Sequence, residues 1–483
     1  MDTTHQVAER LRDSLGADTP NAGSGDRSTG TNRYGLIASA SVLPLALAAS
    51  QFVAPIFAYA CGVLVAALLV LRSDRYALVV LVSATGCSGF TVTAFGVTFL
   101  PEHLLVAVVV MKLVGRPFGR PTYRATDQWL MLLLVLWLGL CITASLLMAN
   151  DTFSSIKILA WLMISVFTLL VVVRLGMDAA SVASDVCVAA TCYATIVFLA
   201  WMLSVNYDEL TIFVQQDYAS EVLRAKGLMI EPNLVASYLC CLLVITVAYG
   251  RRIPTLLITT QCAMTGLVIL ASLTRTAIVV YLALILVLIC KRATPLIAFT
   301  VVATTFLAVL LLATGVWKPN ISVDNTTNPL AVAVADRVNS FGNAGATGTG
   351  ALRAQVAANA LEEINTGPIE NRLFGYGTNS YPQTHFSATA SDGREYLANF
   401  WVAIIYDTGY VGASLIVLAL IGFAFFNGVA GLLLIGTFAV VSTTTNPVWY
   451  GYFWLTAAVV MLFTLAQQRG SKDSRASLIG DRL

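Results

Sequence analysis

The chain has 483 residues, of which 58% are hydrophobic and 11% are charged, and its formal net charge is +2. A soluble domain of this length cannot bury so much apolar surface, so the composition predicts an all-α, polytopic membrane protein. The small net charge and the position of the basic residues at the ends of apolar runs argue against nucleic acid as a partner.

The first 33 residues are polar and contain no apolar signal core, so we expect residues 1–33 to form a disordered tail without a cleaved signal peptide. All nine cysteines lie in apolar runs, and none lies in the long polar segment 318–395. The cysteines therefore predict neither a disulfide framework nor a zinc site.

A bilayer core about 30 Å thick requires about 20 apolar residues per helix. Runs of this kind predict about 12–14 transmembrane helices. Eleven candidates precede the polar segment, at 34–50, 52–71, 76–97, 101–115, 128–148, 156–173, 181–204, 233–249, 253–273, 276–290 and 295–316. Three follow it, at 399–426, 429–447 and 449–466.

Lys and Arg concentrate in the short cytoplasmic loops of membrane proteins, and this bias sets the orientation. With the N-terminus in the cytoplasm, 19 of the 28 basic residues fall in cytoplasmic loops or tails, including a C-terminal tail at 467–483. This orientation places the connection 205–232 and one large loop, 318–395, outside. It also requires 253–290 to form a helical hairpin whose tip, 272–276, faces outward.

Few cations lie on the predicted outer face, and three of them occupy unusual positions. Arg275 lies between two apolar helices, where a cation needs a partner or a function, unless it only extends to the interface. Arg224 and Lys226 precede a span that begins with Pro-Asn. This arrangement suits either the capture of an anion or ordinary flanking charge.

Residues 351–364 predict a short helix in the large loop, which Gly-Pro ends at 367–368. At about 100° per residue, one face gathers the polar side chains Gln355, Asn359, Glu362 and Glu363. Arg353 points the opposite way, among apolar side chains. We therefore expect Arg353 to face the protein or the membrane surface and to meet an anion there.

His385 is the histidine of the large loop, and it follows the glycine pair of Gly375 and Gly377. A histidine titrates near neutral pH and can act as a general base, although a single histidine in a loop is often incidental. Nearby carboxylates are Asp392, Glu395 and Asp407.

Four of these features, in this order, resemble motifs of the O-antigen ligase and O-antigen polymerase superfamily over residues 125–466. Arg224-Ala-Lys-Gly followed by Pro-Asn233 resembles the family's Arg, Gly and Asn element, and Ser272-Leu-Thr-Arg-Thr-Ala is similar to its hairpin. Arg353 resembles the arginine that precedes the family's Gly-x-Gly turn, here Gly375 and Gly377. Asn399 and Asp407-Thr-Gly-Tyr-Val-Gly resemble the closing motif, with Asp407 in place of Glu.

One position departs from the ligase pattern, because Ala398 stands where ligases carry a His before the closing Asn. The departure removes the usual candidate for a base and favours a polymerase or a diverged ligase. Either His385 or a carboxylate replaces that base, or the protein works without it.

The resemblance implies a metal-independent glycosyltransferase without a cofactor, acting on the outer face of the cytoplasmic membrane. Its donor would be a glycan on a polyprenyl diphosphate, and its acceptor a glycan or a lipid. The residues that the resemblance and the chemistry assign to catalysis are Arg353, Arg275, Arg224 and His385. Those assigned to substrate binding are Lys226, Asn233, Gly375, Gly377, Asn399 and Asp407.

A transporter or flippase of a lipid-linked or anionic substrate is the alternative. Such a protein is expected to carry polar residues in mid-span and a repeated half, whereas this sequence offers Asp185, Asp407 and no obvious repeat. A sugar transferase with an acidic pair in its first outer loop is a third class. The first outer loop here contains no acid.

Overall fold

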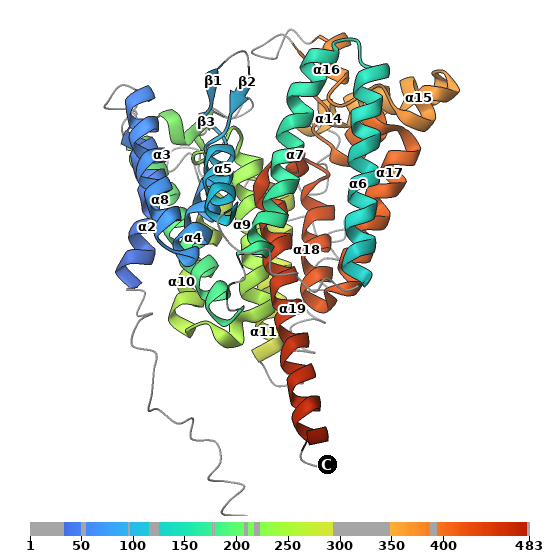
Figure 1. Ribbon diagram of the computed structural model, residues 1–483. Helices are drawn as coiled ribbons and strands as arrows, with labels where there is room; N and C mark the ends of the chain where they lie inside the picture. Colours follow the sequence, from blue (N-terminus) through green and yellow to red (C-terminus); the bar gives the residue numbers. More distant parts are fainter. Residues whose placement is uncertain are drawn as a thin grey trace, which may run out of the picture. The chain divides into compact units, whose positions relative to one another are not determined.

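The computed structural model describes residues 33–49, 55–94, 97–114, 125–175, 177, 179–206, 211–216, 223–292, 348–386 and 394–480. The described residues from Leu36 onward belong to one compact unit. The described residues form helices and two short hairpins, and the protein is an all-α polytopic membrane protein (Figure 1). The predicted span 295–316 and residues 318–347 of the large loop lie outside the described residues.

The helices agree with most of the predicted spans. The first group comprises α2 (Arg33–Ala48), α3 (Pro55–Arg72), α4 (Asp74–Thr85), α5 (Pro101–Val114), α6 (Ala125–Leu147), α7 (Thr152–Arg174) and α8 (Ala179–Asn206). The second comprises α9 (Pro232–Tyr249), α10 (Thr255–Ser272), α11 (Arg275–Arg292), α17 (Phe400–Phe426), α18 (Gly428–Val441) and α19 (Gly451–Gly480). Short 3-10 turns are η2 (Thr211–Phe213), η3 (Gly250–Arg252) and η5 (Pro447–Trp449).

Six helices within the described residues are long and apolar enough to cross a bilayer, and four shorter helices of 10–17 residues are also apolar. The predicted hairpin at 253–290 is present, because α10 ends at Ser272 and α11 begins at Arg275. Leu273 makes the reversal in a left-handed conformation, with φ of 52°.

The predicted span 76–97 is wrong. Helix α4 ends at Thr85, and the chain continues into an antiparallel hairpin of β1 (Val92–Ala94) and β2 (Val97–Phe99). Glycines and β-branched residues after Thr85 disfavour a helix and favour a strand. Gly89 also approaches the 228–229 backbone so closely that a Cβ would lie 2.8 Å from Leu228 O.

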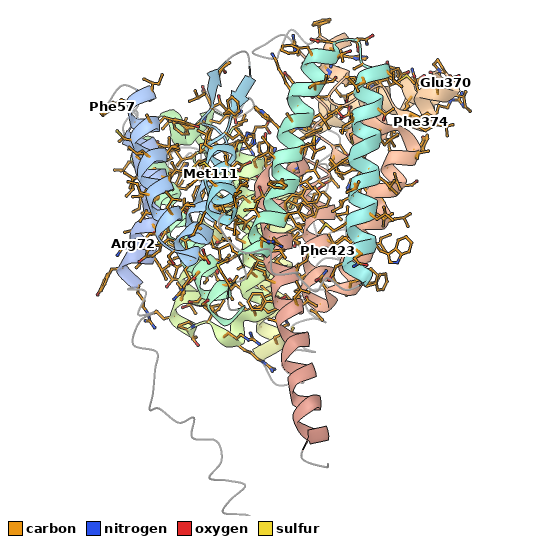
Figure 2. The ribbon with its side chains drawn as sticks, viewed as in Figure 1. Phe57, Arg72, Met111, Glu370, Phe374 and Phe423 are labelled. Carbon is orange, nitrogen blue, oxygen red and sulfur yellow. The ribbon has the colours of Figure 1, made fainter. Side chains whose placement is uncertain are left out.

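The helix α9 is central, because it packs against α8, α10, α11, α18 and α19. Nearly all of its side chains are buried, in keeping with a sequence that is apolar on every side. Peripheral helices expose apolar side chains instead, as Phe57 (62% exposed) and Met111 (65%) illustrate, whereas Phe423 is buried at 4% (Figure 2). This inverted exposure is expected of a protein surrounded by lipid.

The described part of the large loop forms three short helices, α14 (Gly348–Thr366), α15 (Ile369–Phe374) and α16 (Tyr381–Thr384). The predicted helix 351–364 is therefore present as α14 and is longer by a few residues. Both α14 and α15 pack against α17. The loop is thus attached to the helix that follows it in the chain.

Candidate functional site

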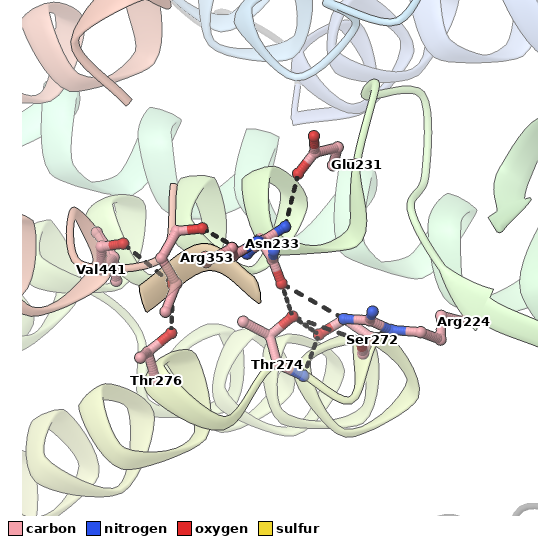
Figure 3. Close-up of polar contacts among 9 residues, drawn as sticks. Arg224, Glu231, Asn233, Ser272, Thr274, Thr276, Arg353 and Val441 are labelled. Carbon is pink, nitrogen blue, oxygen red and sulfur yellow. Dashed lines mark hydrogen bonds and ion pairs between the residues drawn. The ribbon is translucent and has the colours of Figure 1, made fainter. Parts of the chain in front are cut away.

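The hairpin before α9 places Arg224 beside the tip of the α10–α11 hairpin. Strand β4 (Leu223–Ala225) pairs with β3 (Val214–Gln216) and carries Arg224 at its centre. The guanidinium donates from Nε to Ser272 O at 2.9 Å and from Nη2 to Asn233 Oδ1 at 3.4 Å (Figure 3). Both acceptors are neutral oxygens, so these two bonds orient the cation without cancelling its charge.

Asn233, in the first turn of α9, connects the two hairpins. Its Oδ1 also accepts from Thr274 Oγ1 at 3.1 Å, so one amide oxygen joins the 224 strand and the 272–276 tip. Arg275 follows Thr274 and begins α11, so its backbone lies at the same place. The structure therefore brings Arg224, Asn233 and the segment of Arg275 together.

Arg353 reaches the same region from α14. Its Nη1 donates to Thr444 O at 2.8 Å, and Thr444 Oγ1 lies 3.0 Å from Thr276 Oγ1. Its Nη2 lies 3.7 Å from Oε2 of Glu231, the residue just before α9 (Figure 3). The side chains of Arg353 and Glu231 are 35% and 44% exposed, so the pair is open to solvent and weak.

We name this group the arginine cluster; it consists of Arg224, Glu231, Asn233, Thr274, Arg275, Arg353 and Thr444. Its members come from a strand, the start of α9, the α10–α11 tip, α14 and the loop after α18. Its members include three arginines and one carboxylate, all from the part of the chain that the structure describes. Such a group suits an anion with several oxygens, because guanidinium groups bind phosphate through paired donors.

Lys226 lies one residue beyond β4, and its backbone N–H donates to Phe213 O at 2.9 Å. Burial lowers the pKa of its ammonium group, which means that its surroundings solvate a cation poorly. Within the part of the chain that the structure describes, no hydrogen bond or ion pair joins this ammonium group to the cluster. Its role in substrate binding stays a prediction.

His385 belongs to a second group in the large loop, which we name the tyrosine–histidine cluster: Glu363, Tyr376, Tyr381, His385, Glu395 and Tyr406. His385 Nε2 lies 3.2 Å from Glu363 Oε2, and Tyr406 donates to Glu363 Oε1 at 2.8 Å. The His385 ring stacks on Tyr381 at 3.9 Å between centroids. Burial and Glu395 raise the pKa of Tyr381, so its hydroxyl stays a donor to that carboxylate.

The second cluster is separate from the first. Glu363 lies ten residues after Arg353 on α14, which is about 15 Å along the helix axis. His385 has a partner at each ring nitrogen, because Nδ1 lies 3.1 Å from Tyr381 O and 2.9 Å from Thr384 Oγ1. This setting gives a histidine base no vacant nitrogen, so the predicted catalytic role of His385 lacks geometric support.

Gly375 and Gly377, which the sequence predicted to bind substrate, lie where the backbone of the large loop contacts the backbone of α17. Helix α17 breaks at Gly409, where φ is 65°, and the break leaves the carbonyls of Tyr406 and Asp407 available to other donors. They accept from Tyr376 N at 2.9 Å and Gly377 N at 3.0 Å. A Cβ on Gly375, with φ of 78°, would lie 2.4 Å from Asp407 C, so only glycine permits this approach.

Asn399 and Asp407 also have structural tasks. Asn399 is the N-cap of α17, and its Oδ1 accepts from Trp401 N at 2.9 Å and Val402 N at 3.4 Å. Asp407 is 3% exposed, and the backbone amides of Asn379 and Ser380 lie at its carboxylate. Gly375, Gly377 and Asp407 thus hold the loop on α17, and Asn399 caps that helix. Within the described residues, none of the four is bonded to the arginine cluster.

Sequence reasoning missed Glu231 and Thr444. Glu231 stands beside the Pro-Asn pair that was singled out, so an acid next to paired cations could have indicated it. Thr444 contributes a backbone carbonyl from a polar break between two spans, and no side-chain pattern identifies such a group. Within the described residues, no group of three or more His, Cys, Asp or Glu is placed to hold a metal ion.

Residues 261–417 match the family model of the O-antigen ligases. The match supports assignment to the O-antigen ligase and polymerase superfamily, and it contains Arg275, Arg353 and the glycine motifs. Arg224 and Asn233 lie outside the matched residues, but Arg224 donates to Ser272 O and Asn233 accepts from Thr274 Oγ1, both within them. No curated protein matches the chain.

Proposed function

We propose that the protein is a membrane glycosyltransferase that polymerises or ligates a polyprenyl-diphosphate-linked glycan. The observation that supports this most strongly is the arginine cluster at the start of α9. Three cationic segments that are distant in sequence converge there through Asn233 and Thr444. The O-antigen ligase match agrees with glycan transfer and with a lipid-linked substrate.

The chemistry requires little beyond the cluster. A diphosphate is already a good leaving group, so the enzyme mainly stabilises the negative charge that grows on it as the bond to the sugar breaks. Arg224, Arg275 and Arg353 would bind its oxygens, with Lys226 as a further cation. Because arginines supply this stabilisation, we propose that transfer needs no metal ion.

We place the site on the outer face of the cytoplasmic membrane, with both termini inside. The support is the distribution of basic residues, since 19 of 28 then lie in cytoplasmic segments. The polyprenyl tail would lie among the exposed apolar side chains in the bilayer, and the large loop would shield the sugar from water. The acceptor would be a second glycan or a lipid.

Transport loses support as the alternative, because the two carboxylates on which it depended have protein partners. Asp185 accepts from Arg75 Nε at 2.7 Å and Nη2 at 2.5 Å, which ties α8 to α4. Asp407 lies against backbone amides in the loop contact. Neither arrangement provides a mid-membrane group that a transported substrate could bind.

The test is transfer by purified protein. Incubated in detergent with EDTA and lipid-linked glycans extracted from the producing cells, the protein should lengthen or relocate the glycan and release polyprenyl diphosphate. Turnover that stops on chelation and returns with magnesium would contradict metal independence. No release of polyprenyl diphosphate under any condition would refute the proposed transfer.

Orientation has its own test. A cysteine introduced at exposed Gln355 should react with an impermeant thiol reagent in intact cells, above the background of the unmodified protein, and one at Ser471 should not. The opposite pattern would put the arginine cluster on the cytoplasmic side.

A further inference from the structure

Glu231 occupies a helix N-cap position without acting as a cap. Residues at this position usually bond the free N–H groups of the first turn, and Ser, Thr, Asp and Asn do so best. The Glu231 side chain makes no capping bond. Its carboxylate instead lies 3.7 Å from the guanidinium of Arg353, on a different element. The side chain is therefore directed to the arginine cluster.

Other acids and the histidine of this region are engaged elsewhere. Glu363 is held by Tyr406 and His385, and Glu395 accepts from the Tyr381 hydroxyl. Asp407 is buried behind the loop contact. Within the described residues, Glu231 is the carboxylate in contact with Arg353, and at 44% exposure an acceptor molecule can reach it.

We propose that Glu231 is the general base of the transfer; this rests on the proposed function. The acceptor hydroxyl oxygen attacks C1 of the donor sugar and forms the new glycosidic bond. The bond between C1 and the diphosphate oxygen breaks, and the electron pair leaves with polyprenyl diphosphate. The hydroxyl proton passes to the Glu231 carboxylate and from there to water. A single displacement of this kind inverts the configuration at C1.

The ion pair must separate for this reaction, and its geometry allows that. The attacking and leaving oxygens lie on opposite sides of C1. A base that contacts the attacking oxygen and a cation that contacts the leaving oxygen therefore stand about 8–10 Å apart in the reactive complex. In the structure the two groups are 3.7 Å apart on long, partly exposed side chains. A donor entering between them would leave Arg353 with the diphosphate and Glu231 with the acceptor.

The experiment combines Glu231→Gln and Glu231→Ala with an azide rescue. Glu231→Gln should lower the transfer rate at saturating donor by about a hundredfold or more, the usual range for a lost base. It should bind polyprenyl diphosphate at least as tightly as wild type, because a competing carboxylate is gone. Glu231→Asp should recover part of the rate. Glu362→Gln, on the exposed face of α14, is the matched control and should behave as wild type.

Azide distinguishes a base from a merely structural carboxylate. Azide is an anion with no proton to lose, so Glu231→Ala supplied with sodium azide should form a glycosyl azide of inverted configuration. Arg353→Ala should form none. Glu231→Gln within threefold of wild type, loss of polyprenyl diphosphate binding, or no glycosyl azide despite normal binding would each overturn the assignment. Failure of the wild type to consume lipid-linked glycan would instead refute the underlying function.

Discussion

The two polar clusters differ in the partners of their charged side chains. In the tyrosine–histidine cluster, both carboxylates have partners of complementary character: Glu363 contacts the Tyr406 hydroxyl and the His385 imidazole, and Glu395 accepts from the Tyr381 hydroxyl. In the arginine cluster, Arg353 and Arg224 donate to neutral oxygens, and one half-exposed glutamate accompanies three arginines.

This difference distinguishes a cluster that attaches the large loop to α17 from a cluster that can bind a ligand. A network that satisfies its own donors and acceptors stabilises a fixed arrangement, here the attachment of α14 and α16 to α17. Several guanidinium groups that are gathered at one partly exposed place can bind an anion through paired donors. The sequence motifs of the large loop thus have two different roles. Arg353 belongs to the candidate binding site, whereas the glycines belong to the attachment of the loop to α17.

The largest expected effect tests the binding role of Arg353. Arg353→Ala removes charge-assisted bonds to an anion whose charge grows in the transition state, so glycan transfer should fall about a hundredfold, or about 3 kcal/mol. Arg353→Lys should restore only part of the transfer rate, because an ammonium group cannot reproduce the two parallel donors of a planar guanidinium. The measurement is transfer by membranes that contain equal amounts of each variant.

Gln355→Ala serves as the control, since Gln355 is on the exposed face of the same helix and its side chain donates to Asn359. It should keep wild-type transfer. Equal activity of Arg353→Ala and Gln355→Ala would remove the distinction between the clusters.

A large effect on stability, rather than on chemistry, is expected from Gly375→Ala. The new Cβ would lie 2.4 Å from the Asp407 and Thr408 backbone, in a left-handed conformation, so the loop must move off α17. We expect a loss of about 2–3 kcal/mol and a lower thermal midpoint in detergent. Gly139→Ala, where a Cβ meets nothing within 4 Å, should be neutral or slightly stabilising.

A smaller effect is expected from Tyr406→Phe. The change removes the hydroxyl that donates to Glu363 at 2.8 Å and preserves the ring, so it should cost about 1 kcal/mol of stability. Transfer per folded molecule should stay within about twofold of wild type. A hundredfold loss of transfer with normal stability would place this cluster in the active site.

The smallest effect is expected from His385→Asn. The His385–Glu363 contact is about one-third exposed on each side, so its loss should cost between about 0 and 1 kcal/mol. Transfer measured between pH 6 and 8 should follow the wild-type profile. If His385 is the base, the variant would lose transfer by orders of magnitude, and the assignment to Glu231 would be wrong.

Local features of the chain were predicted well where one element decides them. The apolar runs predicted most helices, because a span must bury its backbone polar groups within its own hydrogen bonds. The 272–276 tip followed from basic pairs at both ends of 253–290. The 3.6-residue period of 351–364 placed Val356 and Ala360 on the buried side with Arg353, and both are buried.

Tertiary structure decided what depends on contacts between distant segments. The early end of α4 goes with a close approach of Gly89 to the 228–229 backbone. The glycine motifs attach the loop to α17 because two backbones meet at Gly375 and Gly409. The Thr444 carbonyl and the direction of the Glu231 side chain belong to no local pattern. Sequence alone determined which segments carry cations and span the membrane. Packing around α9 determined which of those cations lie close together. Residue types alone do not indicate which distant segments come into contact or where a backbone carbonyl points.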